Sequence, residues 1–187
     1  MYINISNKLS NEFKNFNIEE IEGGASKKNF YRLSHSKKKF IVTDFSSDKE
    51  EYNNHLRVYN LLKNIDISIP KMIEKYDNNL ITISEDFGDL RFDKILQKYP
   101  LNDLLHYAVD TLIVLKNSTQ YDSTLSFPQY TFDTFKKEIF ELPKYYFPHI
   151  NLNNQNLKDE FIYIWTEAYR NIKFEFNHLV HKDFNIN

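Results

Sequence analysis

Along the first half of the chain, hydrophobic residues cluster in short segments separated by turn-forming residues. The segments are rich in Ile, Val, Phe and Tyr, and Gly23-Gly24 and His35-Ser36 mark the turns between the first three. Such segments, bounded by turn residues, predict β-strands. Two later segments flank an Asp-Asn-Asn turn at residues 77–79, whose residue types tolerate left-handed backbone angles. We expect strands at residues 17–22, 30–34, 39–45, 70–76 and 80–85.

The spacing of hydrophobic residues changes to a helical period after the third of these segments. Ser47 or Asp48 can cap the start of a helix, because their short side chains accept hydrogen bonds from free backbone N–H groups. The apolar residues that follow recur three or four positions apart, which predicts a helix at residues 48–63. From residue 92 onward the pattern stays helical, and we expect helices at residues 101–115, 132–146 and 157–176.

The strands precede most of the helices, with one helix inserted between the third and fourth strands. Antiparallel strands followed by helices are typical of the α+β class, here with a β-rich first lobe and a helical second lobe. We expect the boundary at Phe87-Gly88-Asp89, so that residues 1–88 form the first lobe and residues 89–187 the second. Small ligands usually bind in clefts between lobes. A single α+β domain without an active cleft fits the same order of elements.

Composition excludes several classes of function. The chain has 24 basic and 26 acidic residues and a formal net charge of -2, so it lacks the positive charge that binds a nucleic-acid backbone. It has no cysteines, which excludes disulfides and thiolate metal sites, and its histidines show no metal-ligand spacing. The N-terminus lacks the apolar core of a signal peptide, and no apolar run is long enough to span a bilayer. We therefore expect a cytoplasmic protein that binds neither nucleic acid nor membrane.

Two stretches in the first half fit contacts with a nucleotide. Residues 22–26, Glu-Gly-Gly-Ala-Ser, join two strands, and their glycines let backbone N–H groups approach an anion closely while the serine adds a hydroxyl donor. A hairpin turn without a ligand also fits them. Residues 84–89, Ser-Glu-Asp-Phe-Gly-Asp, follow the fifth strand and can present free backbone groups to the edge of a flat base such as adenine. A polar linker with a glycine hinge also fits this second stretch.

The last nine residues, Leu-Val-His-Lys-Asp-Phe-Asn-Ile-Asn, contain a third candidate. In phosphoryl transfer to a hydroxyl, a carboxylate accepts the hydroxyl proton, and an amide or carboxylate a few residues later holds the magnesium ion that bridges the phosphates. The loop signature is His-x-Asp, four residues, then Asn. His181 and Asp183 fit its first half, and the Asn would fall directly after Asn187. A solvent-exposed loop with an incidental histidine fits the same residues.

In this order, the three stretches resemble the aminoglycoside phosphotransferase and choline kinase superfamily. Within it, the chain is most similar to the bacterial kinases that act on the anomeric hydroxyl of N-acetylmuramic acid and N-acetylglucosamine in cell-wall recycling. The similarity spans nearly the whole chain in the family's order, over residues 23–33 (GGASKKNFYRL), 40–50 (FIVTDFSSDKE), 56–62, 69–73, 83–89 (ISEDFGD), 127–139 and 179–187 (LVHKDFNIN).

This resemblance implies a protein-kinase-like, two-lobe α+β fold and an ATP-dependent transfer of phosphate to a hydroxyl of a small molecule, most closely an amino sugar. Asp183 would be the catalytic base, and His181 would hold the catalytic loop in shape. The residues implied to contact ATP are Gly23, Gly24, Ala25, Ser26 and Thr43 around the phosphates, and Glu85, Asp86 and Phe87, through backbone groups, at the adenine.

Superfamily members continue well past the catalytic loop. By comparison, we expect this chain to be an N-terminal fragment that ends in that loop, with an incomplete helical lobe and with the Mg²⁺ ligands beyond Asn187. We therefore expect the 187 residues by themselves to be inactive.

Two positions depart from the superfamily pattern. Its members usually place a lysine on the third strand, paired with a glutamate on the following helix, and here these positions hold Thr43 and approximately Asn54. Their joint loss is physically consistent, because a buried glutamate without its lysine would be an uncompensated charge. Lys28 or Arg32, beside the glycine loop, are the alternatives for supplying positive charge to the phosphates, and Arg32 also fits a surface position on a strand.

The acceptor is less constrained than the nucleotide. Glu138 is a candidate contact for a sugar, because a carboxylate accepts two hydroxyl hydrogen bonds at once, although a solvated helix face fits it too. Choline or an aminoglycoside is the alternative acceptor within the same class. A non-catalytic nucleotide-binding protein with the same fold is the alternative from another class, and the missing lysine suits it.

Overall fold

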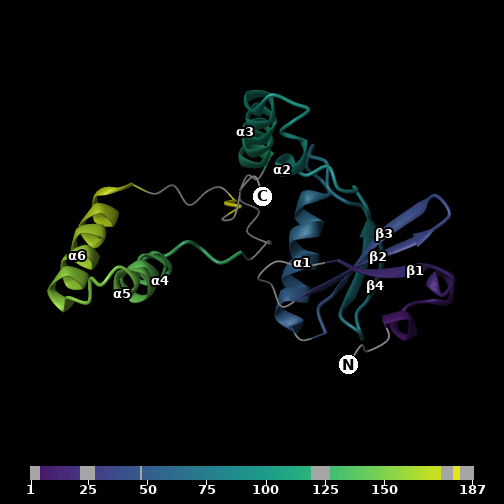
Figure 1. Ribbon diagram of the computed structural model, residues 1–187, viewed down its shortest axis with the longest axis horizontal. Helices are drawn as coiled ribbons and strands as arrows, with labels where there is room; N and C mark the ends of the chain where they lie inside the picture. The colour runs from purple at the N-terminus through teal and green to yellow at the C-terminus, as the bar shows by residue number, and fades with distance from the viewer. Residues whose placement is uncertain (1–4, 22–27, 47, 119–126, 174–178, 182–187) are drawn as a thin grey trace. The chain divides into compact units, whose positions relative to one another are not determined.

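The computed structural model describes residues 5–21, 28–46, 48–118, 127–173 and 179–181. The chain divides into two compact units, unit 1 from Met1–Ser118 with Val180–Asn187 and unit 2 from Thr119–Leu179. Unit 1 holds the β-sheet with helices α1 to α3, and unit 2 holds helices α4 to α6 (Figure 1). The bounds of these units differ from those of the expected lobes, 1–88 and 89–187. The two lobes stay a prediction.

Unit 1 is built on a five-stranded antiparallel sheet in the order β1-β2-β3-β5-β4. Each strand lies within about two residues of its predicted position, which confirms the α+β prediction for the described part of the chain. The strands are β1 (Asn17–Ile21), β2 (Asn29–His35), β3 (Lys38–Asp44), β4 (Met72–Tyr76) and β5 (Ile81–Glu85).

The turn between β4 and β5 differs from expectation in one detail. The left-handed residue is Leu80, with φ of 53°, and not one of the Asn or Asp residues at 77–79. The backbone N–H of Phe45 donates to the Leu80 carbonyl oxygen at 2.9 Å. This bond joins the turn to the end of β3, which explains why a less suited residue adopts the strained angle.

One face of the sheet forms the hydrophobic core of unit 1. Side chains that alternate along the inner strands, Leu33, Val42, Ile81 and Ile83, have no exposed surface, with fractions of 0% each. They pack against two 3-10 turns at the N-terminus, η1 (Ile5–Lys8) and η2 (Asn11–Phe13), for which the sequence predicted no structure. The N-terminal segment therefore closes this face of the sheet.

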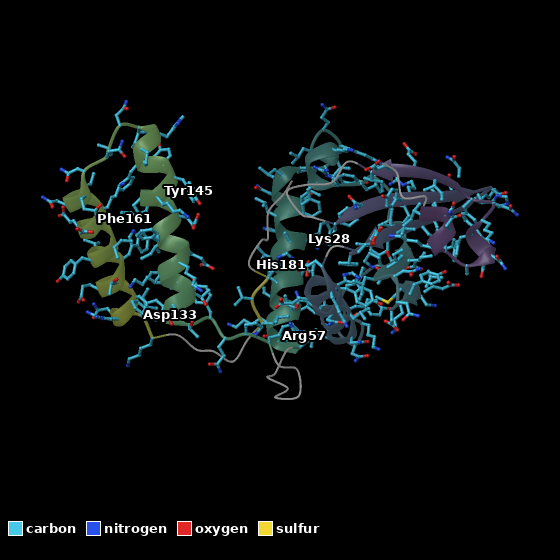
Figure 2. All side chains as sticks on the ribbon, turned by 90° about the horizontal axis from the view of Figure 1, so that it is seen from below. Lys28, Arg57, Asp133, Tyr145, Phe161 and His181 are labelled. Carbon is cyan, nitrogen blue, oxygen red and sulfur yellow. The ribbon has the colours of Figure 1, made fainter. Side chains whose placement is uncertain are left out.

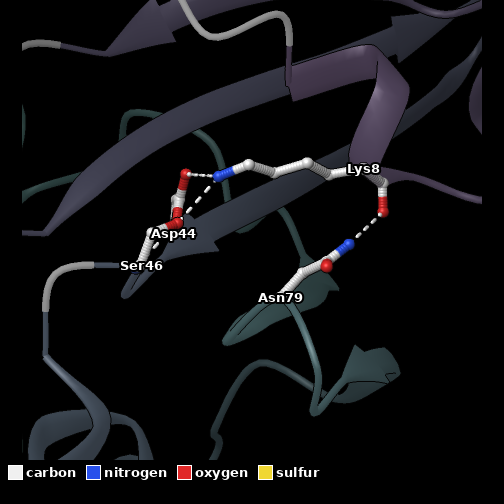
Figure 3. Close-up of polar contacts among 4 residues, drawn as sticks. All are labelled: Lys8, Asp44, Ser46 and Asn79. Carbon is white, nitrogen blue, oxygen red and sulfur yellow. Dashed lines mark hydrogen bonds and ion pairs between the residues drawn. The ribbon is translucent and has the colours of Figure 1, made fainter.

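A buried carboxylate fixes the N-terminal segment in place (Figure 3). Asp44, whose side chain is 8% exposed, lies 3.1 Å from the Lys8 ammonium and accepts a hydrogen bond from the backbone N–H of Ser46 at 2.8 Å. The Asn79 side-chain amide donates to the Lys8 carbonyl oxygen at 3.1 Å. The contacts join η1 to the end of β3 and to the β4–β5 turn, so the segment has one register on the sheet.

Helix α1 (Lys49–Leu62) lies beside the sheet in Figure 1 and confirms the predicted helix at 48–63. Two tyrosines attach it. The Tyr52 hydroxyl donates to Asp77 at 2.6 Å, and the Tyr59 hydroxyl accepts from the backbone N–H of Met72 at 3.0 Å. The ring of Tyr52 also packs edge-on against Phe45, with centroids 5.6 Å apart. These contacts hold α1 against β3, β4 and the turn after β4.

Two further helices complete unit 1. They are α2 (Phe92–Ile95) and α3 (Leu101–Ser118). The apolar residues whose spacing predicted this helix are Leu101, Leu104, Leu105, Ala108, Leu112 and Leu115. Of these, Leu104, Ala108 and Leu115 are buried, at 4%, 8% and 7% exposure. Leu105, on the same predicted face, is 39% exposed, so only part of that face is buried within the described structure.

Unit 2 consists of helices α4 (Phe132–Glu141), α5 (Phe147–His149) and α6 (Gln155–Asn171), with a π-helical segment at Leu142–Tyr146. The helix predicted at 132–146 is confirmed, but its second part is π-helical and not α-helical. Pro143 explains the difference, because proline has no N–H to donate and its ring clashes with the carbonyl group four residues earlier. Helix α6 also begins two residues before the predicted 157–176 and ends at Asn171.

Aromatic rings join the helices of unit 2. Phe132 and Phe135 of α4 lie 5.1 and 4.6 Å from the ring centroid of Tyr169 in α6. Phe147 lies edge-on to Phe161, at 5.5 Å. Among the helices in the described part of the chain, none is both long and apolar enough to cross a lipid bilayer.

The packing of η1 and η2 predicts a matched pair of leucine variants. Leu9 is 6% exposed in the core, whereas Leu90 is 78% exposed in the same unit. We expect Leu9→Ala to lower the free energy of unfolding by about 2 to 5 kcal/mol, because it removes buried methyl groups and leaves a cavity. Leu90→Ala should change it by less than about 0.5 kcal/mol. Urea unfolding followed by far-UV circular dichroism measures both, and equal effects would show that the N-terminal segment does not cover the core.

Candidate functional site

The connector after β5, residues 86–89, has a shape fixed by Asp86. The Asp86 side chain is 3% exposed and lies 2.7 Å from the Nε atom of Arg32 on β2. Its Oδ1 atom also accepts a hydrogen bond from the backbone N–H of Gly88 at 2.7 Å. Gly88 has φ of 76°, a left-handed angle that glycine adopts without steric cost. The sequence Asp-Phe-Gly therefore forms a tight turn that Arg32 anchors to the sheet.

Arg32 makes a second ion pair with the connector. Its Nη2 atom lies 3.1 Å from Oδ1 of Asp89, whose side chain is 68% exposed. The hydrogen bonds that Arg32 donates to Asp89 and Asp86 raise the pKa of Arg32, and the bond to Asp89 lowers the pKa of Asp89. Two carboxylates thus share the guanidinium. Arg32 therefore pairs with the connector. Of the two candidate phosphate-binding cations, Lys28 and Arg32, it is the less suited one.

The connector leaves backbone groups free at the predicted adenine position. Within the described residues, the backbone N–H and C=O groups of Asp86 and Phe87 have no hydrogen-bond partner, and Phe87 is 56% exposed. Glu85 differs, because its backbone N–H donates to the carbonyl oxygen of Lys71 at 2.9 Å. Its carboxylate accepts from the Lys71 N–H at 2.9 Å as well. Of the three predicted residues, Asp86 and Phe87 thus present free backbone groups, and Glu85 is tied to the strand beside it.

A lysine–glutamate ion pair connects the sheet to α1. The ammonium of Lys28, directly before β2, lies 2.7 Å from Oε1 of Glu51 in α1. The same ammonium lies 5.7 Å from the ring centroid of Phe45, within the range of a cation–π contact. The sequence indicated Lys28 as one of two sources of charge, but the family pattern placed the glutamate near Asn54 and not at Glu51.

The start of α1 explains why Glu51 is available for this ion pair. Asp48 and Glu51 have the spacing of a capping box, in which the glutamate usually turns back to the N–H group of the capping residue. Here Asp48 caps the helix by accepting from the Glu51 N–H at 2.9 Å, but its own N–H donates to the Phe45 carbonyl at 2.7 Å. The Glu51 carboxylate therefore has no N–H group to cap and pairs with Lys28 instead.

His55, one turn after Glu51, completes this cluster. Its ring lies 5.1 Å from that of Phe45. Burial lowers the pKa of His55, the charge of Lys28 lowers it further, and Glu51 opposes the shift. Because the pKa falls below its ordinary value of 6.5, His55 is neutral at pH 7. Lys28 and Glu51 are thus the charged pair of the cluster at this pH.

Thr43, at the position of the usual lysine, is 7% exposed on β3. It lies between Phe30 of β2 and Thr82 of β5 in the sheet register. The predicted residues Gly23, Gly24, Ala25, Ser26 and Asp183 lie outside the described residues. His181 is exposed and belongs to unit 1, the unit that also contains Lys28 (Figure 2).

Glu138 belongs to unit 2 and is exposed on α4. Its carboxylate accepts a hydrogen bond from the Tyr130 hydroxyl. Burial, together with this bond, raises the pKa of Tyr130 to about 12. Tyr130 therefore stays protonated near neutral pH and donates to Glu138.

Metal ligands are not grouped in the described residues. No set of three His, Asp or Glu side chains in that part of the chain lies close enough to hold a metal ion. Since the Mg²⁺ ligands were expected beyond Asn187, the described residues do not test that expectation.

Comparison with known proteins identifies the fold. No protein-family model matches the chain, and no curated protein matches its sequence. A solved structure does match, the ternary complex of streptomycin, ATP and the aminoglycoside phosphotransferase APH(2″)-IIa, with a TM-score of 0.54 and 12% identity. The match covers 91% of this chain and 59% of that chain. A likeness at this identity shows the fold alone, and it confirms the predicted kinase-like, two-lobe α+β fold.

The connector predicts unequal effects for its two aspartates. Asp86→Ala should lower the free energy of unfolding by about 1 to 3 kcal/mol, because it removes the acceptor of the Gly88 N–H and one carboxylate from a mostly buried guanidinium. Asp89→Ala removes an exposed partner of Arg32 and should cost less than about 1 kcal/mol. Urea unfolding at pH 7 measures both. A larger loss for Asp89→Ala would mean that Asp86 does not anchor the connector.

Proposed function

We propose that this chain forms the nucleotide-binding part of an ATP-dependent phosphotransferase that phosphorylates a hydroxyl group of a small molecule. One observation carries the proposal, namely that Asp86 and Phe87 present free backbone groups on a connector whose shape Arg32 fixes. The likeness of the fold to an ATP complex of a phosphotransferase, over 91% of this chain, supports it.

The residues present fit ATP. An adenine edge offers a donor and an acceptor side by side, and a free backbone C=O and N–H on one connector complement them. Thr43 would line the site beneath the nucleotide, and the glycine loop Gly23-Gly24-Ala25-Ser26 would cover the phosphates, with Mg²⁺ as the accompanying ion. ATP supplies the γ-phosphoryl group that is transferred. A cytoplasmic location belongs to the same proposal.

The catalytic step is assigned to the segment at 181–183. Asp183 would accept the proton of the acceptor hydroxyl, and His181 would hold the segment in shape. In support, His181 belongs to the compact unit that also contains the connector. Neither residue needs to contact adenine, so changes there should affect turnover more than nucleotide affinity.

We propose an amino sugar as the acceptor. Glu138 would bind two of its hydroxyl groups, and the Tyr130 hydroxyl that donates to Glu138 would orient its carboxylate. An aminoglycoside is the second candidate, because the matching structure holds streptomycin as well as ATP. Choline is the third candidate acceptor. If the protein binds ATP but phosphorylates no acceptor, the same assays favour a non-catalytic nucleotide-binding protein.

Proline at the connector tests the nucleotide site. Phe87→Pro removes the backbone N–H, whereas Phe87→Ala keeps it and serves as the matched control. We expect the wild-type chain to bind ATP in calorimetry, Phe87→Pro to bind it about tenfold more weakly, and Phe87→Ala to bind it within about threefold of wild type. Far-UV circular dichroism checks that both variants are folded. Equal affinities for all three proteins would refute the adenine assignment.

Substitution of the proposed base tests catalysis. The substitution is made in a form of the protein that transfers phosphate. There, Asp183→Asn should lower turnover by about a hundredfold to ten-thousandfold, since it keeps the shape of the side chain but removes the proton acceptor. The affinity for ATP should stay unchanged. Assays offer N-acetylmuramic acid, N-acetylglucosamine, choline and streptomycin as acceptors. Near-normal turnover of Asp183→Asn would show that the base is another residue, and ATP binding without transfer to any acceptor would favour the non-catalytic alternative.

A further inference from the structure

We infer that Lys28, held by Glu51 of α1, is the cation that binds the nucleotide phosphates in this protein. It would replace the lysine that the third strand lacks at Thr43. This inference rests on the proposed function, and it names a residue that the resemblance alone left open between Lys28 and Arg32.

The strand register places Lys28 on the correct face of the sheet. Asn29 pairs with Asp44 and Phe30 pairs with Thr43, so Lys28 continues the same alternation and faces the side of the sheet that carries Thr43. The contact between the Lys28 ammonium and Phe45 agrees with this register. Two residues along an antiparallel strand span about 7 Å, a distance that the flexible four-carbon stem of lysine largely covers. The ammonium of Lys28 can therefore serve the same region as a lysine at position 43.

The ion pair with Glu51 fixes the position of the Lys28 ammonium and leaves N–H donors of that group for a ligand. An ammonium group has three donors, and the only ion pair recorded for Lys28 among the described residues engages Glu51, at 2.7 Å. The two side chains are 25% and 40% exposed, so water or a phosphate can reach them. An ion pair with this exposure adds little to stability. Its main effect is to fix the position of the lysine against the first turn of α1.

The competing cation has a different function. Arg32 lies between the carboxylates of Asp86 and Asp89 and so offers less positive charge to a phosphate. Lys28 shares a single carboxylate, and the imidazole next to it, His55, is neutral at pH 7. A polyphosphate thus meets a charge-balanced pair at Lys28 and Glu51, but a net negative charge at Arg32 and its two carboxylates.

The test compares ATP with adenosine, which lacks the phosphates. The variant is Lys28→Met, and the control is Lys75→Met, which removes another lysine with a carboxylate partner, Asp77 at 2.6 Å, on the edge strand β4. We expect Lys28→Met to bind ATP about 10- to 100-fold more weakly than wild type, because a charge-assisted contact is lost. Adenosine affinity should be unchanged. Lys75→Met should bind both ligands as wild type does, in calorimetry for ATP and in an NMR titration for adenosine.

Three outcomes overturn the inference. They are unchanged ATP affinity in Lys28→Met, equal losses for ATP and adenosine, and an equal loss of ATP affinity in Lys75→Met. Failure of the wild-type chain to bind either ligand would instead refute the proposed function, and the inference with it. If the methionine variant does not fold, Lys28→Gln gives the same comparison with a polar side chain.

Glu51→Gln tests the positioning role separately. It removes the carboxylate but leaves the lysine, so ATP affinity should fall less than in Lys28→Met. The same variant removes the charge that opposes the lowering of the His55 pKa, so that pKa should fall further, whereas Lys28→Met should raise it. An NMR pH titration of His55 measures both directions. A His55 pKa that responds to neither variant would show that the cluster does not form in solution, which overturns the inference.

Discussion

The sheet of unit 1 must bury its apolar face, and the N-terminal segment makes this possible. Apolar side chains such as Leu33 and Ile83 contribute about 1.5 to 3 kcal/mol each when they leave water, but only if another layer covers them. Here that layer is supplied by η1 and η2, and no helix of the described chain is needed on that face. The ion pair between Lys8 and Asp44 fixes the position of the N-terminal segment along the sheet, because it can form in only one such position.

The opposite face is organised by ion pairs that each join two elements of structure. Arg32 joins β2 to the connector, and Lys28 joins the start of β2 to the first turn of α1. The Lys28–Glu51 pair is partly exposed and so adds little stability, whereas the Arg32–Asp86 pair is mostly buried. Each pair sets the position of a segment that would contact the nucleotide. The loss of the usual lysine at Thr43 therefore does not leave α1 without a charged contact to the sheet. The helix instead meets a lysine from a neighbouring strand, through Glu51.

The sequence predicted the elements whose pattern is periodic. The five strands and α1 were predicted because each has a run of apolar residues long enough to set a period, bounded by turn or capping residues. The turns η1 and η2 were missed because they are only four and three residues long, too short for any period. The π-helical segment has one local signal, Pro143, which lacks the N–H group that an α-helix uses.

The site was predicted in part. The connector was predicted because residues 83–89 are among the stretches that resemble the superfamily. Glu51 was missed because the family pattern pointed about one turn later, to Asn54, although Asp48 and Glu51 have the spacing of a capping box. That Glu51 turns to Lys28 depends on the Phe45 carbonyl taking the Asp48 N–H, a contact set by the end of β3. The most direct test of a nucleotide site on this face is amide hydrogen exchange at Phe87, followed by NMR with and without ATP. We expect ATP to slow exchange at that amide, and unchanged exchange at a saturating ATP concentration would contradict the account.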